Sequence, residues 1–191
     1  MTRIFALALV CSACGSSIAP SPPLLPLVLA GQSNADFLRP FLVSAASPRP
    51  ITGTSNPGSR LAEWDVDAPT GYWRTLAPAL HHPLRAFVWW QGESDAATST
   101  LYLGRLAEFI QRVRVEAADA QLPVVICRVV DDPAFVGIRA AQDAYVASDT
   151  RSVLVSSDGL PREHPDWTTG SAHLSAEGYA AMAQRILAAL P

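Results

Sequence analysis

Three short polar segments of this chain carry a serine, a carboxylate and a histidine. Ser33 lies in GQSN and Glu93 in QGESD, each directly after an apolar run, and His173 lies in HLS, just before a helical pattern. Acyl-transfer enzymes use a histidine that takes the proton of a serine hydroxyl and a carboxylate that orients the imidazole. The three residues therefore predict nucleophilic serine chemistry, provided that the fold brings them together.

The same segments also have plainer interpretations. Ser33 and Asp95 are residue types that cap helix N-termini. His173 lies in a polar loop, which makes a buried structural histidine a poorer interpretation. Gln91 adds a side-chain N–H of the kind that stabilises an oxyanion. The pattern G-x-S-x-G does not occur in the sequence, which argues against the nucleophile elbow of α/β-hydrolases.

Four apolar runs are the expected strands, because continuous apolar runs are typical of parallel sheets covered on both faces. They are Leu24–Ala30, Leu84–Trp90, Val124–Val130 and Ser152–Ser156. Apolar residues spaced three or four apart predict helices. These helices cover residues 103–117, Val136–Ser148 and a C-terminal segment with Ser175 as its N-cap.

The alternation of strands and helices predicts an α/β fold, a three-layer α/β/α sandwich with a mostly parallel central sheet. Segment 38–83 is rich in proline and glycine and is expected to form loops with short elements above the sheet. Ligands bind at the carboxyl ends of the strands in such sheets. Ser33 and Glu93 both follow strands, so this edge is the predicted site.

Four blocks of the chain, in order, resemble those of the SGNH hydrolases. They are GQSNA at 31–35, PGSRLAEW at 57–64, FVWWQGESDA at 87–96 and AHLSAEGYAAMAQR at 172–185. The chain is most similar to the sialate O-acetylesterase and acetylxylan esterase branch, carbohydrate esterase family 6, over about residues 26–188. The resemblance implies a flavodoxin-like SGNH fold and a serine esterase that removes O-acetyl groups from carbohydrates. It implies no metal and no cofactor.

The resemblance also assigns the groups that bind the oxyanion. It implies the backbone N–H groups of Ser33 and Gly58 and the side chain of Gln91. A glycine suits such a position because its backbone can approach a ligand without a Cβ in the way. Gly53 and Gly71 remain alternatives to Gly58.

By the same resemblance Ser33 is the nucleophile and His173 the general base, but the acid departs from the family pattern. The family usually has Asp three residues before the histidine, where this chain has Gly170. The imidazole needs a carboxylate to fix its tautomer. Glu93 is the predicted acid, since some family members use the Glu of QGE, and Asp166 is the alternative. The remaining candidates are Asp158 and Glu163.

Residues 1–20 resemble a secretory signal, with Arg3, the apolar run Ile4–Val10 and small residues after it. Cys14 is followed by GSS, which resembles a bacterial lipidation site. The chain is therefore expected to be secreted or periplasmic, with a lipid anchor at Cys14 left open. Residues 21–191 are expected to form a single esterase domain. Cys127 is alone in that domain and is predicted to be a buried, inert thiol.

The composition limits the partners. The 191 residues include 14 basic residues, all Arg, against 17 acidic ones, so nucleic-acid binding is not expected. No apolar run reaches the roughly 18–20 residues of a membrane span. An acetylated carbohydrate is the expected partner. The rival interpretation is a catalytically inactive carbohydrate-binding or surface module on the same fold, which Gly170 favours.

The tryptophans are a further expectation. Trp64, Trp73, Trp89 and Trp90 are expected to divide between the core and a rim on which a sugar could stack. For Trp89, core packing is the preferred interpretation.

Overall fold

The structure, a computed structural model, describes residues 24–163 and 172–190. The predicted signal segment 1–20, with Cys14, lies outside the described residues, and so do Asp166 and Gly170. Within the described part, none of the helices is both long and apolar enough to cross a membrane.

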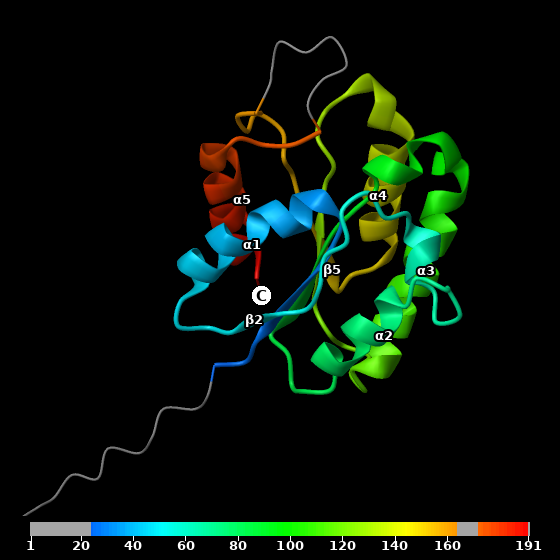
Figure 1. Ribbon diagram of the computed structural model, residues 1–191, viewed down its shortest axis with the longest axis vertical. Coiled ribbons are helices and arrows are strands. Elements are labelled where there is room, and N and C mark those ends of the chain that lie inside the picture. The colour runs from blue at the N-terminus through cyan, green and yellow to red at the C-terminus, as the bar shows by residue number, and fades with distance from the viewer. Residues whose placement is uncertain (1–23, 164–171, 191) are drawn as a thin grey trace, which may run out of the picture.

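A five-stranded parallel sheet forms the centre of the protein (Figure 1). In the order of their positions in the sheet, the strands are β2 (Ile51–Thr52), β1 (Leu27–Gly31), β3 (Ala86–Trp90), β4 (Val124–Cys127) and β5 (Ser152–Val155). Each of them pairs in parallel with its neighbour. Because β1 and β3 are adjacent, the segments that follow them, which hold Ser33 and Glu93, leave the same edge of the sheet.

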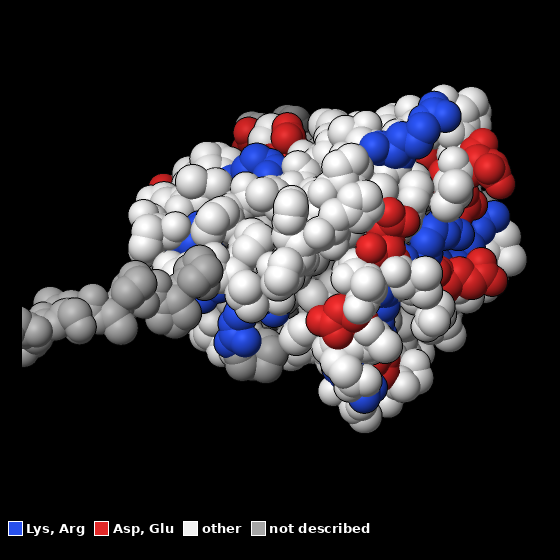
Figure 2. Space-filling model, turned by 90° about the horizontal axis from the view of Figure 1, so that it is seen from below, with Lys and Arg blue, Asp and Glu red and all other residues white. Residues whose placement is uncertain are grey.

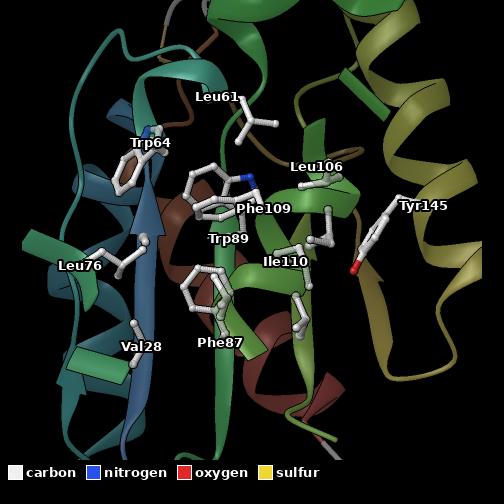
Figure 3. Packing of buried hydrophobic residues seen from close by; sticks show 14 of the residues in the cluster. Val28, Leu61, Trp64, Leu76, Phe87, Trp89, Leu106, Phe109, Ile110 and Tyr145 are labelled. Atoms are coloured by element: carbon white, nitrogen blue, oxygen red, sulfur yellow. The ribbon is translucent and has the colours of Figure 1, made fainter. Parts of the chain in front are cut away.

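The central strands are buried on both sides, which explains why their sequences are continuous apolar runs. In β3, Phe87 and Trp89 pack with Phe109 on one side of the sheet (Figure 3), whereas Val88 and Trp90 pack on the other side. This alternation follows from the two-residue period of a strand. Two apolar clusters, one on each face, therefore fix the sheet between its helices.

Helices cover both faces and complete a three-layer α/β/α sandwich, as predicted (Figure 1). On one face, α1 (Ser33–Ala46) and α5 (Ala176–Ala189) lie side by side. On the other face lie α2 (Tyr72–Leu76), α3 (Ser99–Glu116) and α4 (Val136–Ser148). The connections contain short 3₁₀ helices at Leu61–Trp64, Ala77–Leu80, Glu93–Thr98 and Pro133–Phe135.

The first part of segment 38–83 is helical, which corrects the expectation of loops there. Helix α1 begins at Ser33 and continues through Pro40. A proline inside a helix removes a backbone hydrogen bond and favours a break. Leu38 and Leu42 are fully buried against the sheet, and this tertiary burial outweighs the preference of the proline. The short strand β2 was also not predicted.

The four tryptophans are core residues. Trp64, Trp89 and Trp90 are 0% exposed and Trp73 is 5% exposed. Trp64 meets Trp89 edge-on, with ring centroids 5.1 Å apart (Figure 3). The expectation that some of these rings form a sugar-stacking rim is therefore wrong.

Charged side chains of both signs are mixed on the surface. Figure 2 shows one face, on which basic and acidic groups of the described residues lie next to one another. Ion pairs join Arg112 to Asp65 at 3.0 Å and Arg114 to Asp149 at 2.8 Å. The described residues on the face in Figure 2 form no continuous basic stripe of the kind that follows a phosphate backbone.

Candidate active site

Ser33 is the first residue of α1, directly beyond the carboxyl end of β1. The turn between them is tight because Gly31 has φ of +145°, and a Cβ there would lie 2.0 Å from the Trp90 carbonyl oxygen. The N–H of Gln32 donates to the same oxygen at 3.0 Å. The serine therefore stands half-buried at the edge of the sheet, on a turn that the neighbouring strand holds in place.

The structure brings His173 to Ser33. His173 Nε2 lies 3.0 Å from Ser33 Oγ, which is a hydrogen-bond distance. The histidine loop is fixed by backbone contacts: the Glu163 N–H donates to the His173 carbonyl at 3.2 Å, and the Ser175 N–H donates to the Pro161 carbonyl at 2.9 Å. Two segments separated by 140 positions in the chain are thus placed for proton transfer.

Asn34, the residue after the serine, joins the segments that carry the site. Its side chain is fully buried. Asn34 Nδ2 donates to Glu93 Oε1 at 2.6 Å and to the Ala172 carbonyl at 2.8 Å. Its Oδ1 accepts a hydrogen bond from the Tyr179 hydroxyl at 2.7 Å. One amide therefore connects the start of α1 with the segment after β3, the histidine loop and α5.

The carboxyl group of Glu93 is withdrawn from solvent. Burial raises the pKa of Glu93 to about 7, and hydrogen bonds from its own backbone N–H and from Asn34 act against this shift. Glu93 Oε2 is buried with no hydrogen-bond partner among the described residues. The hydrogen bond of Oε1 goes to Asn34, so the connection to the histidine loop runs through Asn34 to the Ala172 carbonyl. The role of Glu93 as the acid that orients His173 stays a prediction.

The other candidate acids lie in different places. Asp158 pairs with Arg139 at 2.9 Å and with Arg128 at 3.5 Å, so its carboxylate is engaged away from the histidine. Glu163 is exposed and adjoins the histidine loop. Asp166, the alternative acid, lies outside the described residues.

The side chain of Gln91 is fully buried and holds the loop at Gly58. Gln91 Nε2 donates to the Ser59 carbonyl at 3.0 Å and to Asp95 Oδ2 at 2.6 Å. Asp95 Oδ2 also accepts from the Leu61 N–H at 2.8 Å. Because both hydrogens of the Gln91 amide have acceptors, this structure leaves neither of them for an oxyanion.

Gly58 lies in a turn that is attached to the end of β1. The Asn56 N–H donates to the Gly31 carbonyl at 2.8 Å, and Gly58 itself has φ of +74°, which favours glycine. Among the described residues, neither the Gly58 N–H nor the Ser33 N–H donates to a protein acceptor. Within residues 24–163 and 172–190, both N–H groups therefore remain candidates for binding an oxyanion.

The two alternatives to Gly58 have structural roles elsewhere in the fold. A Cβ at Gly53 would lie 2.4 Å from the Leu29 carbonyl oxygen, so this glycine allows the chain to pack against β1. Gly71 directly precedes α2 and adopts a left-handed conformation with φ of +71°. Close packing and helix initiation thus require glycine at these two positions.

Three residues around the serine were not predicted to belong to the site: Asn34, Phe37 and Tyr179. Asn34 is part of the motif GQSN, but nothing in the motif indicates that its amide joins four segments. Phe37 is 46% exposed, and its ring meets the His173 imidazole edge-on with centroids 5.0 Å apart. Its spacing of four from Ser33 could have indicated this position, since such residues share a helix face.

This arrangement suits acyl transfer. An imidazole hydrogen-bonded to a serine hydroxyl can take its proton as the oxygen attacks a carbonyl carbon. Backbone N–H groups that have no acceptor in the described part of the chain can donate to the developing oxyanion. Cys127 is a buried free thiol, as predicted, and burial raises the pKa of this thiol well above its usual range. The described part of the chain contains no group of three or more His, Cys, Asp or Glu placed to hold a metal ion.

Solved structures share this fold at low sequence identity. A protein of Arabidopsis thaliana is 18% identical, with a TM-score of 0.62 over 82% of this chain and 68% of its own. A carbohydrate acetylesterase from Xanthomonas citri is 16% identical, with a TM-score of 0.59 over 78% of this chain and 38% of its own. A carbohydrate esterase of family 3 from Talaromyces cellulolyticus is 12% identical, with a TM-score of 0.61 over 85% of this chain and 94% of its own.

The family of this chain follows from comparisons of its sequence. No curated protein matches the chain. Residues 50–190 match the model of a family described as carbohydrate esterase, sialic acid-specific acetylesterase. Because this match covers most of the sequence, the chain belongs to the sialic acid-specific acetylesterase family of carbohydrate esterases and is an ester hydrolase.

Proposed function

We propose that this protein is a serine esterase that removes O-acetyl groups from carbohydrates through an acyl-enzyme. The observation that carries the proposal is the 3.0 Å contact between Ser33 Oγ and His173 Nε2 at the carboxyl edge of the sheet. The family match supports a sugar ester as the substrate. The similar structure from Xanthomonas citri is itself a carbohydrate acetylesterase.

The first half-reaction transfers the acetyl group to the protein. His173 Nε2 accepts the proton of Ser33 Oγ while this oxygen attacks the ester carbonyl carbon. The N–H groups of Ser33 and Gly58 donate to the oxyanion, and Gln91, whose amide hydrogens are both engaged, holds the Gly58 loop. The bond from the carbonyl carbon to the sugar oxygen then breaks, and the imidazolium gives its proton to that oxygen.

The second half-reaction releases acetate. His173 takes a proton from a water molecule, whose oxygen attacks the carbonyl carbon of acetyl-Ser33. The same two N–H groups stabilise the second oxyanion. The bond to Ser33 Oγ breaks, the imidazolium returns the proton to this oxygen, and acetate leaves.

A carboxylate must keep His173 in the tautomer that accepts at Nε2. We assign this support to Glu93, with Asp166 as the alternative. Glu93 is joined through Asn34 to the carbonyl of Ala172, and so it also contributes to the position of the histidine loop.

The test is acetate release from a panel of acetylated glycans and from nitrophenyl acetate. The wild type is compared with Ser33→Ala, Glu93→Ala and the control Ser44→Ala, an exposed serine elsewhere on α1. The proposal predicts loss of turnover by roughly 10³-fold or more for Ser33→Ala and by about 10²-fold for Glu93→Ala, with wild-type rates for Ser44→Ala.

Other outcomes change the assignment. Ser33-dependent turnover that does not respond to Glu93→Ala would move the acid to Asp166. Folded protein without Ser33-dependent turnover on any acetyl ester would contradict the esterase and favour the rival function, an inactive carbohydrate-binding module.

The composition of residues 1–20 supports a separate proposal, that the chain is exported and carries a lipid on Cys14. Fractionation of expressing bacteria tests it. The wild type is expected in the membrane fraction and Cys14→Ser in the soluble exported fraction. Wild type found free outside the cytoplasm would support simple secretion, and full-length protein retained in the cytoplasm would contradict export.

A further inference from the structure

Residues 156–163, the segment that follows β5, lie beside the histidine loop. The Glu163 N–H donates to the His173 carbonyl at 3.2 Å, and the Ser175 N–H donates to the Pro161 carbonyl at 2.9 Å. Both hydrogen bonds join backbone to backbone. The place of the His173 backbone therefore depends on where residues 156–163 lie.

The same segment packs closely on the first turn of α5. Arg162 and Leu174 form an isolated antiparallel bridge. A Cβ at Gly178 of α5 would lie 2.3 Å from the Pro161 carbonyl oxygen, which leaves no space for a side chain between them. The segment and the residues after His173 are thus one packed unit, so a displacement of the segment also displaces the histidine.

Asp158 attaches this segment to α4. Arg139 Nη2 lies 2.9 Å from Asp158 Oδ1 and 3.0 Å from Asp158 Oδ2, and Arg128 Nη1 lies 3.5 Å from Oδ2. Hydrogen bonds between two charged groups are stronger than those between neutral groups. Arg139 is only 8% exposed, so solvent and salt screen its pair with Asp158 less than they screen a surface pair.

Further contacts fix the segment from both faces of the sheet. On the α4 side, Arg139 Nη1 donates to the Val129 carbonyl, just beyond β4, at 2.7 Å. On the α5 side, Arg185 donates to the carbonyls of Ser156 at 2.8 Å and of Asp158 at 3.0 Å. Because α4 and α5 cover opposite faces of the sheet (Figure 1), the segment cannot shift toward either face without losing contacts.

The other end of β5 carries an ion pair that serves as a comparison. Asp149, which precedes β5, pairs with Arg114 at 2.8 Å, and their side chains are 14% and 12% exposed. The side chain of Asp149 is therefore more buried than that of Asp158, which is 41% exposed. Asp149 lies at the amino edge of the sheet, however, whereas Ser33 and His173 lie at the carboxyl edge.

From these contacts we propose that Asp158 is a positioning residue for His173. Held by Arg139, it fixes residues 156–163, and their backbone hydrogen bonds keep His173 Nε2 within reach of Ser33 Oγ. Asp158 acts through the backbone and takes no part in proton transfer. This inference rests on the serine esterase function proposed above and adds an ion pair on which the geometry of the same site depends.

The test compares the two ends of β5. The constants kcat and KM on nitrophenyl acetate are measured for wild type, Asp158→Asn and Asp149→Asn, together with the rate at which a sulfonyl fluoride modifies Ser33. Thermal unfolding gives Tm for each variant, and all rates are measured well below the lowest Tm. Asp149→Asn is the matched control, because it also breaks a partly buried ion pair with an arginine.

The proposal predicts a loss in kcat that stability does not explain. Asp158→Asn lowers kcat at least roughly tenfold and changes KM by less than about twofold. The rate of Ser33 modification falls by a similar factor, since that reaction also needs His173 to take the serine proton. Asp149→Asn lowers Tm at least as much as Asp158→Asn but keeps the wild-type kcat.

A second variant tests the same segment from α5. Arg185→Ala removes the contacts to the carbonyls of Ser156 and Asp158, and Arg185 is exposed, so the variant should fold. It is expected to lower kcat by about threefold with KM unchanged. If Asp158→Asn does not fold, this variant decides the question, and a wild-type kcat in Arg185→Ala would overturn the inference.

Other results would overturn it as well. These are a wild-type kcat in folded Asp158→Asn, or equal losses of kcat in Asp158→Asn and Asp149→Asn. A loss through KM alone, with Ser33 modified at the wild-type rate, would show that Asp158 acts on substrate binding instead.

The inference and the esterase fail in different ways. Ser33-dependent turnover by wild type that does not respond to Asp158→Asn would overturn the positioning role and leave the esterase intact. Absence of Ser33-dependent turnover in the wild type on every acetyl ester would overturn the esterase and the inference with it.

Discussion

Asn34 Nδ2 donates a hydrogen bond of 2.6 Å to Glu93 Oε1. The same nitrogen donates to the carbonyl of Ala172, so the residue after the proposed nucleophile holds both the buried carboxyl group and the histidine loop. Both contacts need the two hydrogens of an amide, which a carboxylate of the same shape does not have.

Asn34→Asp should therefore reduce the rate while leaving the fold in place. The variant loses the donors to Glu93 and Ala172, and the misplaced histidine loop lowers kcat by about 10²-fold with a smaller change in KM. Because the introduced carboxyl group can donate one hydrogen bond when it is protonated, part of the loss should be recovered at acidic pH, which a pH–rate profile measures. Tyr179→Phe is the control: it removes the contact to Asn34 Oδ1 but leaves both donors of the Asn34 amide in place, and it should cost less. Wild-type kcat in Asn34→Asp would contradict the positioning role.

Glu93 makes the stability of the protein depend on pH. Burial raises the pKa of this carboxyl group to about 7, from 4.5 in the unfolded chain. Between these values the folded state binds more protons than the unfolded state, so the free energy of unfolding falls as the pH rises from about 4.5 to about 7. The stability that the raised pKa of Glu93 contributes is fully present below about pH 4.5. It is lost as the pH rises through about 7.

Glu93→Gln removes this titration. Urea unfolding at a series of pH values should show a decline for wild type of up to about 3 kcal/mol more than for the variant across this range. Other groups that titrate in the same range are present in both proteins. The difference between the two curves of unfolding free energy against pH therefore reports the titration of Glu93. Parallel curves for wild type and Glu93→Gln would contradict the raised pKa of the buried Glu93 carboxyl group.

A variant of Gln91 can distinguish two roles of its side chain, structural support of the Gly58 loop and direct binding of the oxyanion. Its amide hydrogens are taken up by the Ser59 carbonyl and Asp95. Gln91→Ala removes the donor to the Ser59 carbonyl and leaves Asp95 Oδ2 with the Leu61 N–H, and together with the cavity it should lower the free energy of unfolding by about 2–4 kcal/mol. Thermal unfolding and kcat should therefore fall together. A large fall in kcat with an unchanged Tm would instead indicate that the side chain acts on the oxyanion alone.

Gly31 supports the turn that presents Ser33. A methyl group there would lie 2.0 Å from the Trp90 carbonyl, and φ of +145° is unfavourable for any other residue. Gly31→Ala should lower the free energy of unfolding by about 3 kcal/mol or more. The control is Gly104→Ala in α3, where a methyl group meets nothing within 4 Å and should stabilise the helix by up to about 1 kcal/mol. Equal Tm values for the two variants would contradict the tight turn.

The sequence was sufficient to predict four of the five strands and the meeting of Ser33 with His173. Strands buried on both faces leave continuous apolar runs, and the order of the motifs places both residues at the carboxyl edge. Helix α1 could not be predicted, because Pro40 is a local signal against a helix, whereas the burial of Leu38 and Leu42 is a tertiary effect. For the same reason, the core position of all four tryptophans required the packed structure.

The details of the site also depend on tertiary contacts. The motif QGE indicates a carboxylate near the histidine, but not that Asn34 lies between Glu93 and the histidine loop. Nor does the motif indicate that the amide of Gln91 has an acceptor in the neighbouring loop. Phe37 is an exposed aromatic residue whose importance comes only from its contact with His173.

Covalent labelling of Ser33 tests whether this residue is the nucleophile. The protein is treated with a sulfonyl fluoride, digested and examined by mass spectrometry, and acetate release is followed in parallel. If Ser33 is the nucleophile and His173 its base, one adduct forms on the peptide that contains Ser33, at the rate at which activity is lost and much more slowly in His173→Ala. Full loss of activity with Ser33 unmodified, or full activity with Ser33 labelled, would contradict this assignment.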